Sequence, residues 1–396
     1  MKIEKLFFII CLLLFVLSCQ SNTEYQKGTF GYDFSFLKKH IDPIILSNSN
    51  SKIIVSPKLQ GRVLSSTSNG MFGKSYGWLN YKLIESEKFR VGGNGFGGED
   101  RFWLGPIGSK FSLYYNGKEI ESDNWYVPKA IDIETYNVVK KTTSEIEFEK
   151  KLKLVNNINT NFNIKLNRQI KLFSISEIEK DLEIEISKNI KVVGFQSKNS
   201  IENIGNDWIE KNGIIAPWIL GMFQGTHKSI GIFPVNKKEN DSLTIQKYLA
   251  EIDKDKLVCS DSAVFYKTDG AYRSKIGINK INAKPIFGNI DFKNKVLTII
   301  TFKFNNKGNY LNCDEYNHSE LYKGDVVSCY NNASENNVST FFELESAASA
   351  KVLKNGERNI HWHNTYHFEG PMTDLEHIAK KLLGVSLKAL KNDNFK

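Results

Sequence analysis

The sequence contains few of the residues that mark small stapled scaffolds or extended chains. Only 5 of its 396 residues are Cys and only 8 are Pro, which excludes a disulfide-rich miniprotein and a collagen-like or proline-rich chain. Basic residues form no long run, since 53 Lys and Arg are scattered among 44 Asp and Glu. We therefore expect no nucleic acid partner, although the net charge is +9. With 41% hydrophobic residues, the chain can bury a large core.

The few cysteines show no C-x-x-C spacing, so neither a zinc site nor a redox pair is indicated. Three cysteines lie beyond the N-terminal segment: Cys259, Cys313 and Cys329. Cys313 and Cys329 can pair in an oxidising compartment, and free buried thiols are the alternative.

The N-terminus has the pattern of a lipoprotein signal peptide, which we assign to residues 1–18. Lys2 and Lys5 precede an apolar stretch, Leu6–Leu17, that is too short to be read as a membrane span. The stretch ends in Val-Leu-Ser-Cys, which is typical of a lipobox, so we expect Cys19 to carry the lipid. An ordinary signal peptide with an incidental cysteine is the alternative.

Lipidation predicts where the mature protein lies. Acyl chains on Cys19 would hold the polypeptide at a membrane while the folded part stays in water. The next residue is Gln20 and not the Asp of an inner-membrane retention signal. We therefore expect a protein of the cell envelope that is anchored in the outer membrane and faces the periplasm.

Most of the chain beyond the N-terminus has the two-residue periodicity of β-strands. Apolar and polar residues alternate over residues 145–154, 162–172 and 182–186, so each segment is predicted as a strand with one solvent-exposed face. Residues 296–304 are more continuously apolar and predict a central strand that is buried on both faces.

Helices are expected in only two places. Residues 32–40 favour one short helix, and a second helix is predicted near the C-terminus. There, Thr373 and Glu376 have the spacing of a capping box, and Gly384 marks the helix end.

These patterns predict an all-β fold of large antiparallel sheets with a short C-terminal helix. Residues 19–45 are assigned to the lipidated N-terminus and a tether. No fixed repeat or Pro-rich linker interrupts residues 46–396, so we expect these to form a single domain. The alternative is that the chain forms two domains, with the boundary near Asn206.

The glycine-rich segment at residues 91–111 has the composition of a ligand-binding loop. Glycines let the backbone approach a ligand closely, while Glu99, Asp100 and Arg101 can hold hydroxyl groups and Trp103 can stack on a sugar ring. The segment lacks the Gly-Lys-Ser/Thr of a phosphate loop. We expect a carbohydrate site here; the alternative is a turn whose Arg and Glu pair with each other.

Two acidic residues further along the chain are candidates for acid–base chemistry. Alternation places Glu343 and Glu345 on one face of a predicted strand. A carboxylate held in a pocket can act as a general base, whereas a Glu on a wet sheet face would be exposed to solvent.

A turn rich in both charges follows Thr268. Its Arg273 and Lys275 can line a binding site or form a solvated hairpin.

Three histidines alternate along one predicted strand and share its face: His361, His363 and His367. An imidazole there can act as an acid or as a sugar ligand. Three histidines can also bind a metal, but His-x-His spacing alone is weak evidence. We assign no metal and no cofactor.

Several segments, taken in order, resemble an uncharacterised family of bacterial lipoproteins in the galactose mutarotase-like superfamily. They are GGEDRFWLGP (97–106), APWILGMF (216–223), TDGAYRSKIGI (268–278), KGDVVSCYN (323–331) and FELESAASA (342–350). The resemblance covers the chain from about residue 55 onward. It implies a β-supersandwich, in which two large antiparallel sheets pack face to face and leave a concave, carbohydrate-sized cleft.

The resemblance to aldose 1-epimerases also implies roles for single residues. Asp100-Arg101 resembles an Asn-Arg pair whose Arg holds the sugar. Leu344-Glu345 resembles a pair whose carboxylate takes the proton of the anomeric hydroxyl, so Glu345 becomes the candidate base.

The chain departs from the epimerases where they carry the acid His, because the comparable stretch here contains Trp218 and no His. Ring opening needs a proton donated to the ring oxygen while the base removes another. His361, His363 or His227 is the candidate replacement, and Trp218 is a candidate sugar-binding residue.

We therefore expect a membrane-anchored lipoprotein that binds carbohydrate or glycan in a concave cleft. One alternative is a sugar 1-epimerase, or a related sugar isomerase, with Glu345 as general base. A second is a non-catalytic subunit of an envelope complex that binds its partner through a sheet face. Which sugar is bound depends on loop positions that no spacing rule fixes.

Overall fold

Antiparallel strands dominate the computed structural model, which describes residues 24–89, 93–236, 243–312, 321–333 and 340–393. The predicted signal peptide, Cys19 and Cys313 lie outside these residues. Within the described ranges, no helix is long and apolar enough to cross a bilayer.

The larger sheet has ten strands in the order β12-β13-β10-β15-β16-β19-β8-β7-β6-β5, and every neighbouring pair is antiparallel. Its strands are β5 (Asn137–Lys141), β6 (Glu145–Val155), β7 (Asn161–Leu172), β8 (Lys191–Asn203), β10 (Ser229–Pro234), β12 (Leu257–Cys259), β13 (Ala263–Lys267), β15 (Ile286–Asp291), β16 (Val296–Phe302) and β19 (Arg358–Glu369). Strand β16 lies near the centre and is buried on both faces, which confirms the prediction from its continuous apolar sequence.

The second sheet has six strands in the order β11-β14-β17-β18-β9-β4, again all antiparallel. Its strands are β4 (Arg101–Gly105), β9 (Ala216–Gln224), β11 (Ile245–Tyr248), β14 (Ser274–Asn279), β17 (Asp325–Asn331) and β18 (Phe341–Ala347). Strand β9 packs over β19 and β8 of the larger sheet, and apolar side chains from both sheets form one large core. The predicted all-β sandwich of large antiparallel sheets is therefore confirmed.

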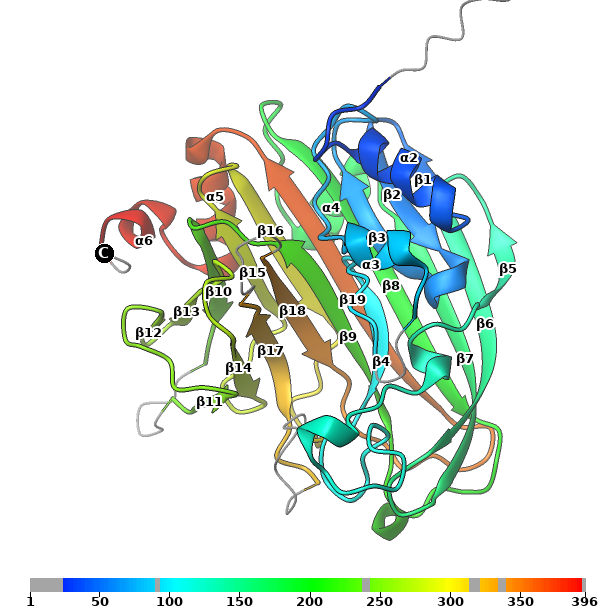
Figure 1. The fold of residues 1–396 in the computed structure, drawn as a ribbon. Helices are drawn as coiled ribbons and strands as arrows, with labels where there is room; N and C mark the ends of the chain where they lie inside the picture. Colours follow the sequence, from blue (N-terminus) through cyan, green and yellow to red (C-terminus); the bar gives the residue numbers. More distant parts are fainter. Residues whose placement is uncertain (1–23, 90–92, 237–242, 313–320, 334–339, 394–396) are drawn as a thin grey trace, which may run out of the picture.

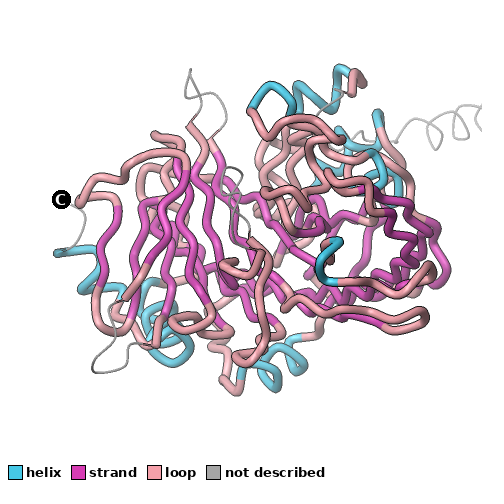
Figure 2. The backbone as a smooth tube through the Cα atoms, turned by 90° about the horizontal axis from the view of Figure 1, so that it is seen from below, coloured by secondary structure: helices cyan, strands magenta, loops and turns pink. Residues whose placement is uncertain are grey.

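Helices lie at the periphery of the two sheets (Figure 2). They are α2 (Phe30–His40), α3 (Tyr81–Ser86), α4 (Ile175–Leu182), α5 (Met372–Leu383) and α6 (Leu387–Asp393). Helices α5 and α6 gather at one side of the molecule and α2 and α3 at the other (Figure 1). Helices α4 to α6 cover apolar residues of the ten-stranded sheet in a second hydrophobic cluster.

The N-terminal part of the described chain is folded onto the sandwich. Strands β1 (Ile44–Asn48), β2 (Ser51–Ser56) and β3 (Arg62–Thr67) form a small antiparallel sheet. Helix α2 buries Phe30 and Leu37 in a third cluster, together with residues of β2 and β3. The ordered fold therefore extends into residues 19–45, which the sequence assigned to a tether.

Residues 182–186, predicted as a strand, are not one. Leu182 is the last residue of α4, which begins after Ser174, where Ser174 and Glu177 form a reciprocal capping box. Ile178 and Leu182 lie one turn apart and bury the same face of this helix. The cap and the four-residue spacing favour the helix over a short alternating pattern.

The C-terminal helix forms where it was predicted and ends at Gly384, whose φ of 70° is left-handed. The predicted capping box of Thr373 and Glu376 does not form, because the helix begins earlier, after Pro371, with no side-chain cap. Glu376 instead accepts a hydrogen bond of 2.8 Å from the Ser386 hydroxyl, which connects α5 to the chain entering α6.

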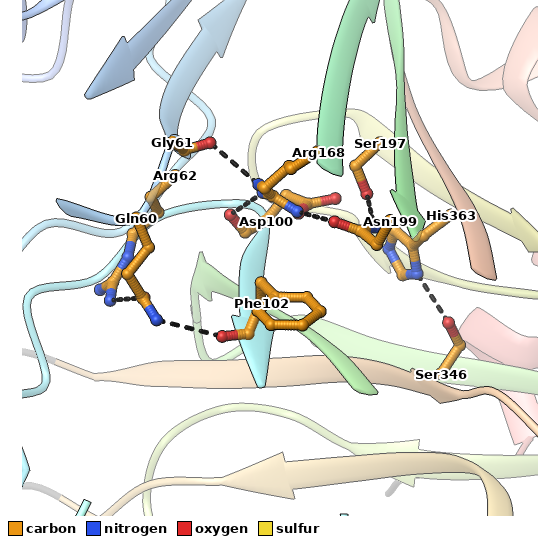
Figure 3. Close-up of polar contacts among 10 residues, drawn as sticks. All are labelled: Gln60, Gly61, Arg62, Asp100, Phe102, Arg168, Ser197, Asn199, Ser346 and His363. Atoms are coloured by element: carbon orange, nitrogen blue, oxygen red, sulfur yellow. Dashed lines mark hydrogen bonds and ion pairs between the residues drawn. The ribbon is translucent and has the colours of Figure 1, made fainter. Parts of the chain in front are cut away.

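A buried polar network connects the two large sheets to each other and to the turn that precedes β3 (Figure 3). Arg168 on β7 is fully buried, and its Nη2 lies 2.5 Å from Oδ1 of Asp100, the residue before β4. The same guanidinium donates to the Asn199 side chain on β8 at 2.5 Å and to the Gly61 carbonyl at 3.1 Å. Because a buried charge is costly unless it is paired and hydrogen-bonded, this pairing fixes the position of β4.

Removing the Arg168 charge should destabilise the protein far more than removing an exposed one. Arg168→Met leaves Asp100 buried and unpaired, so we expect a loss of about 3–5 kcal/mol in the free energy of unfolding, measured by urea denaturation. Lys171→Met is the matched control, because Lys171 lies on the same strand and pairs with Glu177 at 2.7 Å on the surface. It should cost less than about 1 kcal/mol; equal losses would show that the buried pair has no special role.

Candidate functional site

A cavity of about 210 Å³ lies on the face of the six-stranded sheet that is turned away from the ten-stranded sheet. We call it the sheet cavity. Strand alternation supplies its floor, because every second residue of β4, β9 and β18 faces it. These residues are Arg101, Trp103, Trp218, Leu220, Met222, Phe341, Glu343 and Glu345.

The register of the strands sets which groups lie side by side. Arg101 on β4 is paired with Leu220 on β9, and Leu220 is paired with Glu345 on β18. One row across three strands therefore carries a guanidinium, an apolar centre and a carboxylate. In the adjacent row, Trp103 is paired with Trp218, and their rings meet edge to face with centroids 5.7 Å apart.

Two ion pairs cross the floor of the sheet cavity. Nη2 of Arg101 lies 3.0 Å from Oε1 of Glu343, and Nζ of Lys275 on β14 lies 3.0 Å from Oε2 of Glu345. All four side chains are largely buried. Each cation also lies over an indole, Arg101 over Trp103 and Lys275 over Trp218, at 4.4 and 4.8 Å from the ring centroids.

Three polar atoms of the lining residues are buried and have no hydrogen-bond partner in the structure: Nε of Arg101, Nε1 of Trp103 and Oε1 of Glu345. Two are donors and one is an acceptor. An unsatisfied buried polar atom costs about 1–3 kcal/mol, so a ligand that supplied partners to these three atoms would recover part of that free energy. A ligand with several hydroxyl groups can both accept from the donors and donate to the carboxylate.

The rim of the sheet cavity adds a further cation and a phenol. Nε of Arg273 donates to the hydroxyl of Tyr330 on β17 at 3.2 Å, and that hydroxyl donates to the Asn332 side chain at 2.9 Å. Arg273 is exposed and lines the cavity together with Trp125. The rim thus offers a charged group and an aromatic ring to a ligand bound on the floor.

Seven of the predicted site residues line the sheet cavity. They are Arg101, Trp103, Trp218, Arg273, Lys275, Glu343 and Glu345. The predicted alternation of β18 is confirmed, because Glu343 and Glu345 line the sheet cavity while Phe342 and Leu344 do not. The chain segments that carry these residues are far apart in sequence and converge on one cavity.

Asp100, His361 and His363, also predicted as site residues, lie inside the sandwich instead. Asp100 is held by Arg168, as described above. His361 and His363 on β19 are fully buried and share the hydroxyl of Ser346, at 2.8 Å from each ring. Ser346 points inward because its neighbour Glu345 points outward, so neither histidine contacts the sheet cavity, and no other histidine lines it among the residues that the structure describes.

Glu99 and His367 form a separate pair. Nε2 of His367 lies 2.8 Å from Oε2 of Glu99, with both side chains buried. His367 lines a different cavity, at the junction between the sandwich and the N-terminal part of the fold. Within the described part of the chain, no group of three His, Cys, Asp or Glu residues is placed to hold a metal ion.

Sequence reasoning missed several lining residues. Leu220 and Met222 could have been found, because they alternate with Trp218 along β9. Tyr248 on β11 and Tyr330 on β17 could not have been found in this way. No local pattern in the sequence predicts the register of these strands in the sheet.

The chain belongs to a family of unknown function, DUF6786, whose model matches residues 28–394. No curated protein matches the chain in sequence. The match begins where the described fold begins, at the turn before α2.

Solved structures with a similar fold differ widely in sequence. The Slr1438 protein from Synechocystis sp. PCC 6803 is 11% identical, with a TM-score of 0.50 over 84% of this chain and 96% of that chain. A putative aldose 1-epimerase from Escherichia coli K12 is 8% identical, with a TM-score of 0.48 over 83% of this chain and 99% of that chain. A galactose mutarotase-like protein from Lactobacillus casei is 9% identical, with a TM-score of 0.47 over the same shares. At such identities the likeness concerns the fold.

The two buried histidines behind the site should make stability depend on pH. Burial lowers the pKa of His361 to about 3 and that of His363 to about 4. Unfolded histidine titrates near 6.5, so unfolding takes up a proton at each ring as the pH falls below that value. The free energy of unfolding is therefore unaffected by these rings above pH 6.5. Below that pH it falls by about 1.4 kcal/mol per pH unit for each ring, until the pH approaches 4.

Replacing both rings should flatten this dependence. Between pH 6.5 and 5, the unfolding free energy of the double variant His361→Gln, His363→Gln should fall less steeply than that of the wild type, measured by urea denaturation at each pH. His227→Gln is the control, because His227 is exposed. If the double variant keeps the wild-type slope, the rings are not buried in the neutral form.

Proposed function

We propose that the protein is a membrane-anchored lipoprotein that binds carbohydrate in the sheet cavity. The observation that carries this proposal is the set of unpartnered buried atoms on Arg101, Trp103 and Glu345. A sugar supplies both the acceptors and the donor that these atoms need. Its ring also has apolar C–H faces that suit the indoles of the floor.

The size of the sheet cavity favours a short ligand. At about 210 Å³, it is smaller than the roughly 300–1,000 Å³ typical of sites for drug-sized molecules. We therefore expect one sugar ring on the floor, within reach of Arg101, Trp103 and Glu345. Further units of a glycan would extend past the exposed Arg273.

Removing one indole N–H should weaken sugar binding without removing the ring. Trp103→Phe keeps an aromatic face but loses the donor, so the affinity for a sugar found in a panel of monosaccharides and short glycans should fall about 3- to 10-fold in calorimetry. Trp208→Phe is a matched control: Trp208 is equally buried and its Nε1 also lacks a partner, but it packs on Phe162 and does not line the sheet cavity.

The two variants separate a binding role from a structural one. Equal affinity in Trp103→Phe and wild type would contradict the assignment of this atom. A panel in which no sugar binds would remove the proposal and favour a subunit of an envelope complex that docks through a sheet face.

A sugar 1-epimerase is the second candidate function, and Oε1 of Glu345 favours it. This oxygen is buried and unpartnered, so it can accept the proton of an anomeric hydroxyl. The other oxygen of Glu345 accepts a hydrogen bond of 3.0 Å from the ammonium group of Lys275, which is therefore a proton donor beside this carboxylate. The reaction would need that proton, or one from Tyr330, at the ring oxygen.

The epimerase reaction can be tested by exchange NMR between the α and β anomers of hexoses. The wild type should accelerate exchange beyond buffer for at least one sugar, and Glu345→Gln should abolish that acceleration. Glu343→Gln compares the loss of another carboxylate on the same strand face. Because Glu343 pairs with Arg101, this variant should weaken sugar binding but keep the acceleration at saturating sugar. Full activity of Glu345→Gln would rule out this carboxylate as the base, while sugar binding without acceleration would leave a binding protein.

The proposed lipid anchor makes a separate prediction. Cys19→Ala removes the thiol that would carry the acyl chains, so the variant should move from the membrane fraction to the soluble fraction of cells, and its N-terminal peptide should lack the added lipid mass. Cys259→Ala is the control, because Cys259 lies on β12, and it should leave the distribution unchanged. A Cys19→Ala variant that stays in the membrane fraction would contradict the anchor.

A further inference from the structure

The molecule has a second cavity, of about 300 Å³, which we call the junction cavity. It lies where the N-terminal part of the fold meets the ends of strands from both sheets, and the exposed residues Lys27 and Gln224 lie at its rim. It shares no lining residue with the sheet cavity. The proposed sugar site therefore does not account for it.

One row of polar side chains crosses three neighbouring strands at the junction cavity. Asn289 on β15 is paired with Thr298 on β16, and Thr298 is paired with His367 on β19. All three line the cavity. Paired residues of antiparallel strands have side chains on the same face, about 5 Å apart, so the row presents an amide, a hydroxyl and an imidazole side by side.

The imidazole of His367 is held in a defined orientation. Its Nε2 lies 2.8 Å from Glu99 and its Nδ1 lies 2.9 Å from Oγ1 of Thr298. Tyr76 stacks on the ring at a centroid distance of 4.5 Å, and Phe223 approaches it edge to face at 5.6 Å. Four contacts from four parts of the chain thus fix one side chain.

The hydrogen-bond partners also determine where the proton lies on the ring. A carboxylate only accepts hydrogen bonds, so Nε2 carries the hydrogen that is donated to Glu99. In the neutral ring, Nδ1 is then an acceptor, and Thr298 donates its hydroxyl hydrogen to it. A hydroxyl bonded to a histidine base, with the histidine oriented by a buried carboxylate, is the arrangement that activates a nucleophile in acyl-transfer enzymes.

The buried pair behind the sheet cavity shows that this arrangement is not a general consequence of histidines on β19. His361 and His363 both bond to Ser346, but among the described residues no carboxylate hydrogen-bonds to either ring, and neither ring lines the sheet cavity or the junction cavity. His367 differs in having a hydroxyl on one nitrogen, a carboxylate on the other and a cavity beside it.

We propose that the junction cavity is a second reactive site, in which Thr298 is a nucleophile for acyl transfer from small esters of hydroxyl compounds. Oγ1 of Thr298 bonds to the ester carbonyl carbon while its proton moves to Nδ1 of His367. The ester C–O bond then breaks, and the leaving alkoxide takes that proton. Water completes the cycle: its oxygen bonds to the acyl carbon, its proton passes through Nδ1 to Oγ1, and the carboxylic acid leaves.

Asn289 has the position of the oxyanion donor in this reaction. Its Nδ2 donates one N–H to the Thr268 hydroxyl at 2.6 Å, and an amide nitrogen carries two. The second N–H can stabilise the negative oxygen that forms when Thr298 attacks, which is the role side-chain amides play in oxyanion holes. Glu99 touches no substrate in this scheme and acts as a positioning residue for His367.

Covalent labelling tests this proposal without knowledge of the natural ester. A dialkyl fluorophosphate forms an O–P bond to an activated hydroxyl and releases fluoride, while the proton goes to the base. We expect the wild type to be labelled at Thr298, in the tryptic peptide Val296–Lys303, as located by fragment-ion mass spectrometry. Labelling should be at least 100-fold slower in His367→Gln and at least tenfold slower in Glu99→Gln.

Conservative variants separate reactivity from a structural role. Thr298→Ser keeps the hydroxyl and should still be labelled, whereas Thr298→Val keeps the shape and should not. Thr301→Val is the matched control on the same strand, and it should leave labelling unchanged. A folded wild type that takes no label at Thr298, or a label rate that His367→Gln does not change, would overturn the proposal; neither result bears on sugar binding in the sheet cavity.

Discussion

The fold depends on one buried charge pair, between Arg168 and Asp100. Asp100 directly precedes β4, and its carboxylate points inward to Arg168. Because successive side chains of a strand point to opposite faces, this anchor turns the next residue, Arg101, to the outer face. The same alternation on β18 turns Ser346 inward, toward the two buried histidines, and Glu345 outward. The interior network and the outer cavity are therefore two consequences of the same backbone positions.

Local patterns in the sequence predicted which residues of a strand share a face, because this depends only on the geometry of the strand itself. The continuous apolar run of β16 predicted burial on both faces, which the structure confirms. The alternation on β18 placed Glu343 and Glu345 on one face, and both line the sheet cavity. The alternative of a solvent-exposed face is wrong, because both side chains are buried. The resemblance added roles for Arg101 and Glu345. Seven of the residues predicted from the sequence line the sheet cavity.

Features that depend on the partners of a segment could not be predicted in this way. Residues 182–186 alternate like a strand, but the cap at Ser174 and the apolar cluster under α4 decide otherwise. Thr373 and Glu376 have the spacing of a cap, yet Glu376 is used by Ser386. The histidines of β19 share a face, but only the register against β16 and the position of Glu99 separate His367 from the other two.

The central claim is that a sugar satisfies the buried atoms of Arg101, Trp103 and Glu345. A crystal structure of the protein with a sugar from the binding panel tests it most directly. The account predicts a pyranose ring against the indole of Trp103, with a hydroxyl oxygen within about 3 Å of Oε1 of Glu345. A sugar bound elsewhere on the molecule, with these three atoms still unpartnered, would contradict it.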